Sequence, residues 1–248
     1  LYKQSVTKLP AQAGERLDRI EETKVLRVGT PGDYRPFSMK EANGYAGYDI
    51  DLVKALAAAA GWKVEMVPTT WSNLTKDLQG DKFDVAVGGI TQTVARLKVG
   101  DFLPGYAPFG KAALVPASKK DRFTTPESLN QPDVRVIKNP GGTNEKYVLE
   151  HLTKAQVSTH PNNAEIPGMI AEGKGDVMIT DTMEAKLYAK AHPGKLAVLF
   201  AEDTLTPKAQ KAFFVQADDP EYLRVMQYLW DITELRGETA ALYDKWLK

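Results

Sequence analysis

Residues 82–97 read KFDVAVGGITQTVARL, and residues 174–187 repeat the same plan as KGDVMITDTMEAKL. In each segment an apolar run of strand type is followed by a few polar residues and then by a helical stretch. In an alternating chain, such a segment closes a β-α-β-α-β unit whose parallel strands are joined by helices that pack on the sheet. The repetition predicts two α/β lobes built on the same plan.

Two series of elements lead up to these segments. The first series contains strands expected at 25–30, 63–69 and 83–90, with helices at 48–61 and around Leu74 and Leu78. The second contains strands expected at 134–138, 156–161 and 175–181, with helices at 144–155 and at 164–173, the latter broken near Pro167. We therefore expect a parallel-type sheet flanked by helices in both lobes.

The chain around the second series predicts a hinge. Strands at 112–120 and 209–216 are expected to cross between the lobes in opposite directions, before helices at 220–235 and 239–248 that pack on the first lobe. The predicted divisions are lobe 1 at 24–114 and again at 211–248, lobe 2 at 115–210, and an N-terminal extension with a first helix at 1–23. Because ligands of open α/β sheets bind beyond the carboxyl ends of the strands, residues just after each strand should line a cleft between the lobes.

Composition restricts the kind of partner. Lysine plus arginine and aspartate plus glutamate both number 32, so no net charge attracts nucleic acid or an anionic membrane. No apolar run approaches the roughly 18 residues of a membrane span, and no cysteine is present for thiol chemistry. The histidines, His151, His160 and His192, are too widely spaced for a metal pair on one helix. We expect a small-molecule ligand, no membrane insertion, no metal and no cofactor.

The first lobe offers an aromatic wall and an anion-binding loop. Tyr34 follows the first strand and Trp71 the second, so their rings could clamp a ligand; ordinary packing is the alternative for each. After the third strand, Gly89 permits close backbone approach, Thr91 supplies a hydroxyl and Arg96 a fixed positive charge. Because arginine binds a carboxylate through two parallel N–H groups, this loop is a candidate carboxylate site, with a solvated helix arginine as the alternative.

The second lobe offers the loop NPGGTNEK (139–146), between a strand and a helix. The backbone amides at Gly142 and Thr143 suit an anion at a helix N-terminus, although the spacings of phosphate-binding loops are missing and a plain tight turn is the alternative. Asp181 and Glu184 follow the last strand, three residues apart. That spacing is typical of a capping box, which is the structural alternative to a role in the cleft.

These residues resemble the family 3 extracellular solute-binding proteins, which have the two-lobed type II periplasmic binding-protein fold. The resemblance covers about 15–248 and rests on LRVGT (26–30), GYAGYDIDLVKALA (44–57), DVAVGGIT with a following Ala-Arg (84–96), and GDVMITD (175–181). It implies that Arg96 grips a ligand carboxylate, that Asp181 receives an α-ammonium group, and that the protein is periplasmic. The polar residues 1–15 fit a chain whose export signal has been removed, with a trimmed chain as the alternative.

More specifically, the segments GDYRPFS (32–38), VPTTWSNL (67–74), NPGGTNEK (139–146) and HPNN (160–163) resemble the cyclohexadienyl dehydratases of that superfamily. This resemblance implies that Glu184 is a general acid and that Asn139 helps to hold the reacting group. The implied reaction converts prephenate to phenylpyruvate, or arogenate to phenylalanine, with loss of CO2 and water. The alternative is a non-catalytic amino-acid-binding protein that serves an ABC permease.

One segment, 102–114, departs from the dehydratase pattern. It has Gly105 before Tyr106, and Pro108-Phe109 where a basic residue is expected. The departure predicts incomplete neutralisation of the substrate carboxylates. Lys211, in the returning strand, is a candidate for the missing charge, although a solvated hinge lysine is the favoured interpretation.

Overall fold

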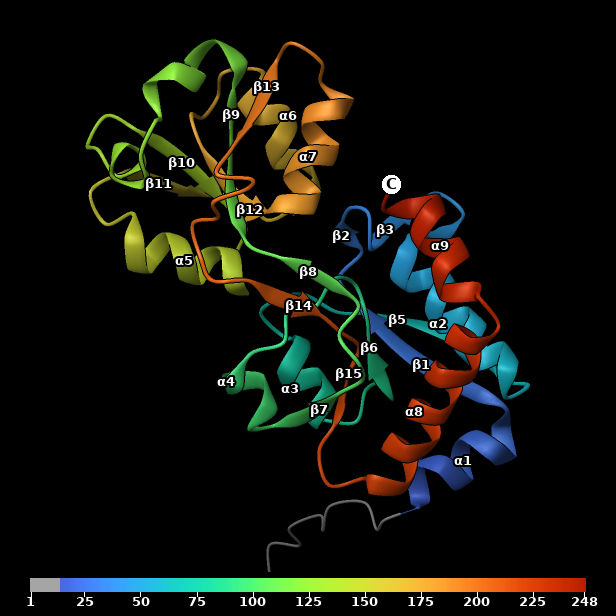
Figure 1. Cartoon of the computed structure of the whole chain (residues 1–248). Helices are drawn as coiled ribbons and strands as arrows, with labels where there is room; N and C mark the ends of the chain where they lie inside the picture. Colours follow the sequence, from blue (N-terminus) through green and yellow to red (C-terminus); the bar gives the residue numbers. More distant parts are fainter. Residues whose placement is uncertain (1–13) are drawn as a thin grey trace, which may run out of the picture.

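The computed structural model describes residues 14–248, which form two α/β lobes joined by a pair of crossing strands (Figure 1). The expectations for residues 1–13, including a removed export signal, lie outside the described residues. Apart from this, the two-lobed α/β fold expected from the repeated segments is present.

The first lobe is built on a five-stranded sheet in the order β5-β1-β6-β15-β7. Its strands are β1 (Val25–Thr30), β5 (Lys63–Pro68), β6 (Val85–Ala86), β7 (Gly100–Phe102) and β15 (Phe214–Gln216). β1 runs parallel to β5 and β6, whereas β15 is antiparallel to β6 and to β7. The predicted parallel order of the first three strands is therefore confirmed, and the returning chain adds an antiparallel strand.

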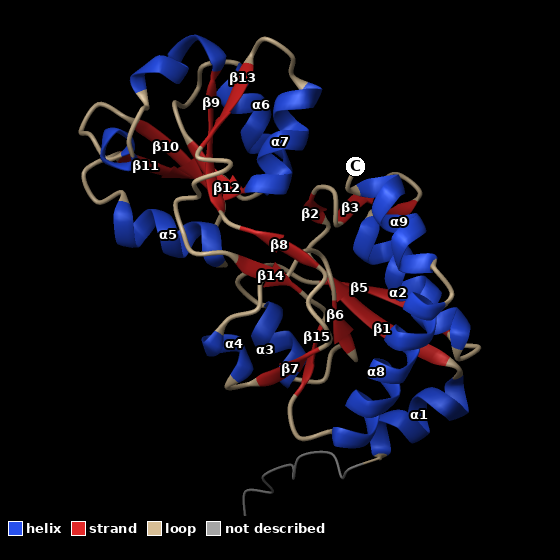
Figure 2. Ribbon diagram, viewed as in Figure 1, coloured by secondary structure: helices blue, strands red, loops and turns tan. Residues whose placement is uncertain are grey.

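Helices cover both faces of this sheet. They are α1 (Glu15–Thr23), α2 (Tyr48–Ala59), α3 (Leu74–Gln79), α4 (Val94–Leu97), α8 (Pro220–Leu235) and α9 (Glu238–Trp246). Figure 2 shows α1, α2, α8 and α9 on one side of the sheet and α3 and α4 on the other. Successive side chains of β6 point to opposite faces of the sheet, which explains the two helical layers. Val85 packs in the core with α2 and α8, whereas Ala86 packs in the core with α3. A hairpin of β2 (Asp33–Tyr34), β3 (Ser38–Glu41) and β4 (Gly44–Ala46) follows β1.

The second lobe contains a two-stranded sheet, β10-β11, and a three-stranded sheet, β12-β9-β13, which an isolated parallel bridge between Val136 and Val177 joins in the order β11-β10-β12-β9-β13. Its strands are β9 (Lys111–Pro116), β10 (Arg135–Lys138), β11 (Gln156–Thr159), β12 (Met178–Asp181) and β13 (Leu196–Leu199). Its helices are α5 (Thr143–His151), α6 (Ile166–Ala171) and α7 (Thr182–Ala191), with short 3-10 helices η1 (Ala117–Arg122), η2 (Pro126–Leu129) and η3 (Asn163–Glu165). The Ile137 N–H donates to the Val177 carbonyl at 3.0 Å, which joins β10 to the start of β12. Pro167 does not break α6, because it lies in the first turn, where no N–H donor is needed.

The crossing strands are β8 (Ala107–Phe109) and β14 (Ala209–Lys211), which pair antiparallel. The predicted first crossing at 112–120 is wrong. Residues 111–116 are the buried central strand of the second sheet, between β12 and β13, and the boundary expected at 114 falls inside it. The predicted strand at 209–216 divides into β14, which crosses, and β15, which enters the first sheet.

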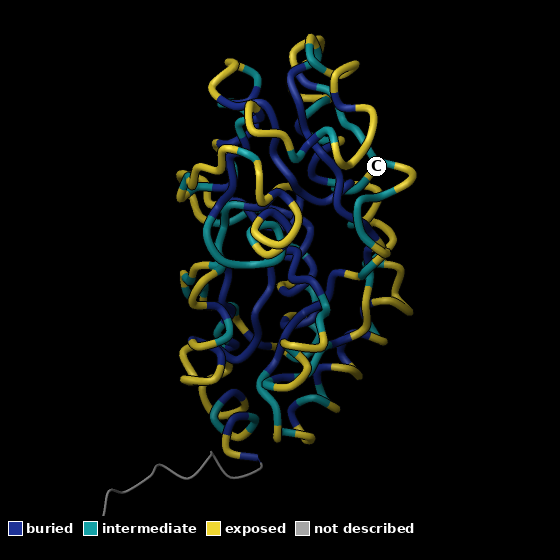
Figure 3. The backbone as a smooth tube through the Cα atoms, turned by 90° about the vertical axis from the view of Figure 1, so that its left-hand side faces the viewer, coloured by how far each residue is buried: buried dark blue, intermediate teal, exposed yellow. Residues whose placement is uncertain are grey.

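The distribution of buried residues follows the two-lobed arrangement. Figure 3 shows buried chain running through the middle of both lobes, with exposed turns at the periphery. Among residues 14–248 no helix combines the length and the apolar character that a membrane crossing needs. In the same part of the chain, no three histidine, aspartate or glutamate side chains gather as a metal site would require.

Candidate functional site

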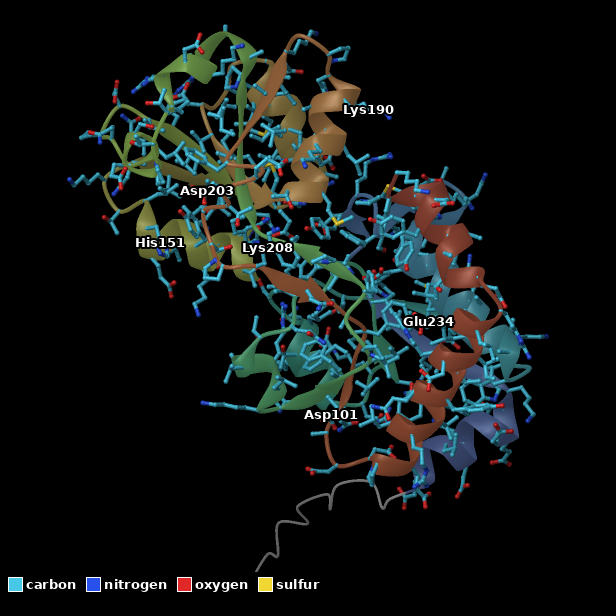
Figure 4. All side chains as sticks on the ribbon, in the orientation of Figure 1. Asp101, His151, Lys190, Asp203, Lys208 and Glu234 are labelled. Carbon is cyan, nitrogen blue, oxygen red and sulfur yellow. The ribbon has the colours of Figure 1, made fainter. Side chains whose placement is uncertain are left out.

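A cavity lies between the lobes, beyond the carboxyl ends of β1, β6, β10 and β12. It encloses about 320 Å³, including the part that is open to solvent, and is lined by Tyr34, Trp71, Gly89, Thr91, Arg96, Asn139, Gly141, Gly142, Thr143, Asn144, Asn163, Asp181 and Lys211. Figure 4 shows side chains of both lobes meeting around the crossing strands. Every residue predicted for the site lines this cavity except Glu184, which is buried behind it.

Asp181 is the centre of a buried ionic cluster in the cavity. Its Oδ1 accepts from Lys111 Nζ at 2.7 Å and its Oδ2 from Lys211 Nζ at 2.6 Å, and the Tyr34 hydroxyl donates to it as well. Burial by itself would raise the pKa of Asp181, but the two ammonium groups outweigh burial and hold that pKa well below its usual range. Asp181 is therefore a carboxylate that already has cationic partners.

Two interpretations from the sequence are wrong at this cluster. Lys211 is not a solvated hinge residue: it is 1% exposed, and its Nζ lies 4.0 Å from the centre of the Phe109 ring. Burial lowers the pKa of Lys211 to about 8, with the neighbouring Asp181 opposing that shift. The capping box is also absent, because the Asp181 side chain forms no cap bond and binds the lysines instead.

Lys111 was missed by the sequence interpretation. It begins β9, and its Nζ donates to Thr143 Oγ1 at 2.8 Å and to Asn144 Oδ1, which brings the Gly-Gly-Thr loop to Asp181. The sequence has Pro108-Phe109 where the dehydratases were expected to carry a basic residue. Lys111 supplies that positive charge. A lysine at the start of an otherwise apolar strand, KAALVP, was the available signal, because lysine is seldom buried without a partner.

Hydrogen bonds to the Asp49 carboxylate hold the loop after β6 in place. Gly88 and Gly89 donate their N–H groups to Asp49 Oδ2 at 2.7 and 2.9 Å. A Cβ atom on Gly89, whose φ is +72°, would lie 2.6 Å from the Phe37 ring, so glycine is required there. Asp49 is fully buried, and burial raises its pKa to about 6 against the opposing hydrogen bonds.

Arg96 extends this loop into the cavity. Its Nη1 donates to the Thr91 carbonyl at 2.8 Å, and Thr93 caps the short helix α4 by accepting from the Arg96 N–H. Burial lowers the pKa of Arg96 to about 10, so the guanidinium stays charged at neutral pH. Lys211 Nζ also donates to Thr91 Oγ1, at 3.2 Å. The predicted anion-binding loop is thus brought next to the ionic cluster.

The two lobes touch at the cavity entrance through Gly141 and Ser72. A Cβ atom on Gly141, whose φ is +75°, would lie 2.5 Å from the Ser72 backbone nitrogen in the other lobe. We expect Gly141→Ala to prevent this closure and to raise the KM of the substrate roughly tenfold, since 1.4 kcal/mol of lost binding corresponds to that factor. Small-angle scattering with and without ligand should show less compaction in the variant, whereas the open-turn control Gly173→Ala should compact normally.

Glu184 is completely buried on the first turn of α7. Its Oε1 accepts from Asn163 Nδ2 at 2.8 Å and its Oε2 from the Thr180 hydroxyl. Burial is the main reason that the pKa of Glu184 lies well above its ordinary value; the nearby carboxylates of Asp181 and Asp33 raise it further, while Thr180 and Lys211 oppose. The Glu184 carboxyl group is therefore a weaker acid than an exposed glutamate, and its Oε1 is hydrogen-bonded to Asn163, a residue of the cavity wall.

The remaining wall combines aromatic rings and an amide. The Tyr34 and Trp71 rings meet edge to face, 5.9 Å apart, and Trp71 Nε1 donates to Asp33 Oδ1 at 2.9 Å. Asn139 is 5% exposed, and its Oδ1 has no hydrogen-bond partner. A buried acceptor without a partner in a cavity wall is available to a ligand hydroxyl or ammonium group.

Comparisons with known proteins point to a single family. The model of the bacterial extracellular solute-binding proteins, family 3, matches residues 26–248. A cyclohexadienyl dehydratase of Pseudomonas aeruginosa is 41% identical over 94% of this chain and 86% of its own length. Among solved structures, an ancestral amino acid-binding protein described as a precursor of cyclohexadienyl dehydratase is 39% identical, with a TM-score of 0.85, over 94% of this chain and all of that one. An ancestral cyclohexadienyl dehydratase is 48% identical over 94% of this chain and 96% of that one, with a TM-score of 0.56.

Proposed function

The chain belongs to the bacterial extracellular solute-binding proteins, family 3, and from that membership and the cavity we propose that it is a cyclohexadienyl dehydratase, a lyase that acts on prephenate. One observation carries the proposal: a fully buried carboxyl group, Glu184, whose pKa burial raises well above its ordinary value, is hydrogen-bonded at 2.8 Å to Asn163 in the wall of a cavity that carries excess positive charge. A transport protein needs the charges of the cavity but has no use for a buried weak acid beside them.

The charge of the cavity suits a dianion. Arg96, Lys111 and Lys211 are cationic and Asp181 is anionic, which leaves two positive charges. Prephenate carries two carboxylates and no cation, so it neutralises this excess. We assign one carboxylate to Arg96 and the amides near Thr91 in the first lobe, and the other to the lysines and the Gly142-Thr143 backbone, whose loop Lys111 contacts through Thr143.

The reaction needs one proton and an ordered substrate. The bond from the ring to its carboxylate breaks and releases CO2, its electron pair enters the ring, and the C–O bond to the ring hydroxyl breaks as Glu184 delivers the proton that makes water. Aromatisation drives the step, so the protein has to orient the ring and protonate the leaving group. Tyr34 and Trp71 form the walls against the ring, and Asn139, with its free acceptor, holds the ring hydroxyl. Closure of the lobes excludes water from the acid.

The same charges predict a preference between the two cyclohexadienyl substrates. Arogenate carries an ammonium group, which would have to compete with Lys111 and Lys211 for Asp181. We expect kcat/KM for prephenate to exceed that for arogenate at least tenfold, because about 1.4 kcal/mol of unfavourable charge corresponds to that factor. Parallel assays of phenylpyruvate and phenylalanine formation measure the ratio, and an equal or reversed ratio would refute the assignment of Asp181 to the lysines.

The function itself is tested by mixing the protein with prephenate at neutral pH and following phenylpyruvate by its ultraviolet absorbance in alkali. A protein-free sample corrects for the acid-catalysed decomposition of prephenate. We expect turnover far above that blank. Absence of turnover with both prephenate and arogenate would exclude the dehydratase.

The second candidate is a periplasmic amino-acid-binding protein that serves an ABC permease. The likeness to the ancestral amino acid-binding protein, at a TM-score of 0.85, favours it. In that function Asp181 would receive an α-ammonium group, which requires both lysines to withdraw. Thermal stabilisation by individual amino acids, with no turnover of prephenate, would establish this alternative. Because the family is that of the bacterial extracellular solute-binding proteins, we propose a periplasmic location for the protein.

A further inference from the structure

Asn163, the last residue of the HPNN segment, has no role in the function proposed above. It begins η3 and is 1% exposed. Among the described residues it is the side chain that both lines the cavity and hydrogen-bonds to Glu184. Its position raises the question of what it does for the buried acid.

The amide of Asn163 joins the two lobes. Its Nδ2 donates to the Asp33 carbonyl at 3.3 Å and to Glu184 Oε1 at 2.8 Å, which uses both hydrogens of the amide. Its backbone N–H donates to Asp33 Oδ2 at 3.3 Å. Because Asp33 belongs to β2 of the first lobe and Glu184 to α7 of the second, these bonds form together only when the lobes are closed.

The amide orientation follows from its partners. The Asp33 carbonyl can only accept, so the atom that faces it must be the NH2 group, and Oδ1 is left buried without a partner. An N–H donor on Oε1 stabilises the carboxylate that Glu184 becomes as its proton leaves. Asn163 thus supplies stabilisation at the moment when charge develops on the acid.

We propose that Asn163 is a positioning residue for the general acid. When the lobes close, contact with Asp33 orients the Asn163 amide, and the amide holds Glu184 for proton transfer. The proposal rests on the proposed function of Glu184. It differs from a purely structural role because it predicts a change in acid strength as well as in rate.

The titratable groups around Glu184 determine how that change is measured. They are the carboxyl groups of Asp181 and Asp33, the phenols of Tyr34 and Tyr188, and the ammonium group of Lys211. None of them is altered by a substitution at Asn163. Loss of the amide donor removes stabilisation of the ionised form only, so the pKa of Glu184 should rise.

The test compares Asn163→Leu, which keeps the volume and removes the amide, with Asn162→Ala. The Asn162 side chain caps the same turn by accepting from the Ala164 N–H, and its amide donates to Glu165; within residues 14–248 it forms no hydrogen bond to Asp33 or Glu184. Its loss therefore measures the structural contribution of this turn. We expect Asn163→Leu to lower kcat roughly tenfold to a hundredfold with KM changed less than about threefold, as for a hydrogen bond to a group that becomes charged. Asn163→Ala, which adds no bulk, provides the same kcat and KM comparison if the leucine variant does not fold.

A second readout does not depend on turnover. Carbon-13 NMR of labelled glutamate side chains, assigned with Glu184→Gln, follows the titration of Glu184 directly. Its midpoint should move to higher pH in Asn163→Leu and stay in place in Asn162→Ala. An unchanged midpoint, or an equal loss of kcat in both variants, would overturn the inference. If the wild type turns over neither substrate, the proposed function fails, and the NMR midpoint still decides whether Asn163 controls Glu184.

Discussion

Glu184→Gln should reduce prephenate turnover by a factor of about 10² to 10⁴, the usual contribution of one general acid. Glutamine has nearly the same shape and can still accept from Asn163 Nδ2, but it has no acidic proton to deliver. The loss should appear in kcat and leave KM almost unchanged, because Glu184 does not line the cavity. Phenylpyruvate formation at saturating prephenate is the measurement.

The stability of the same variant provides the control. Because the pKa of Glu184 is raised on folding, the folded wild type keeps a proton that the unfolded chain loses above the ordinary value of 4.5. Wild-type stability therefore falls as pH rises from 4.5 toward the raised pKa, and the glutamine variant, which has no such proton, is spared that loss. We expect Glu184→Gln to gain stability over the wild type at pH 7 and to lose that advantage below pH 4.5. Retained turnover in this well-folded variant would remove Glu184 from the mechanism.

Lys211→Met should lower kcat/KM for prephenate roughly a hundredfold, since truncating one member of a buried charge pair costs about 2–5 kcal/mol. The substitution removes one of the two positive charges in excess and leaves Asp181 with Lys111 alone. Most of the loss should appear as a higher KM, because the charge binds the substrate before and during the reaction. Steady-state kinetics with prephenate separate the two constants.

The pH dependence of kcat/KM distinguishes loss of the Lys211 charge from a nonspecific loss of activity. Burial lowers the pKa of Lys211 to about 8, so the wild-type kcat/KM should fall above that pH as the ammonium group loses its proton. The Lys211→Met enzyme has no such group and should show no decline there. The exposed Lys208, labelled in Figure 4, precedes the same strand and provides the matched control Lys208→Met. An equal loss in both variants would contradict a specific role for Lys211.

The function and the role of Asn163 proposed above couple binding to chemistry through closure. Gly141 meets Ser72 at the entrance, and Asn163 meets Asp33 at the side of Glu184, so one movement of the lobes closes the cavity and orders the acid. In a binding protein the same movement only retains the ligand. The addition of a buried acid behind the closing wall makes closure useful for proton transfer, because water is excluded as the acid is positioned.

Local patterns in the sequence were sufficient for the two-lobed plan, although not for the segment 112–120, which was expected to cross between the lobes and instead contributes the central strand β9. The apolar runs at 25–30 and 83–90, the helical periodicity of 48–61 and the repeat at 174–187 depend on neighbours within a few residues. Residues that follow strands were placed at the cleft for the same reason, since the direction of parallel strands determines which loops meet. Loops such as 139–146 and side chains such as Arg96 were therefore predicted without tertiary information.

Only the tertiary structure decided which charged side chains are buried and which ion-pair partners they have. Lys111 and Asp181 are 70 residues apart in sequence, and Lys211 pairs with the same carboxylate from the other side of the hinge. Whether a lysine such as Lys211 is solvated or buried, and whether Glu184 caps a helix or keeps a proton, depends on what packs around it. The pKa of a carboxyl group is set by burial and by charges brought near through space, and neither quantity is a property of the residues adjacent in the chain.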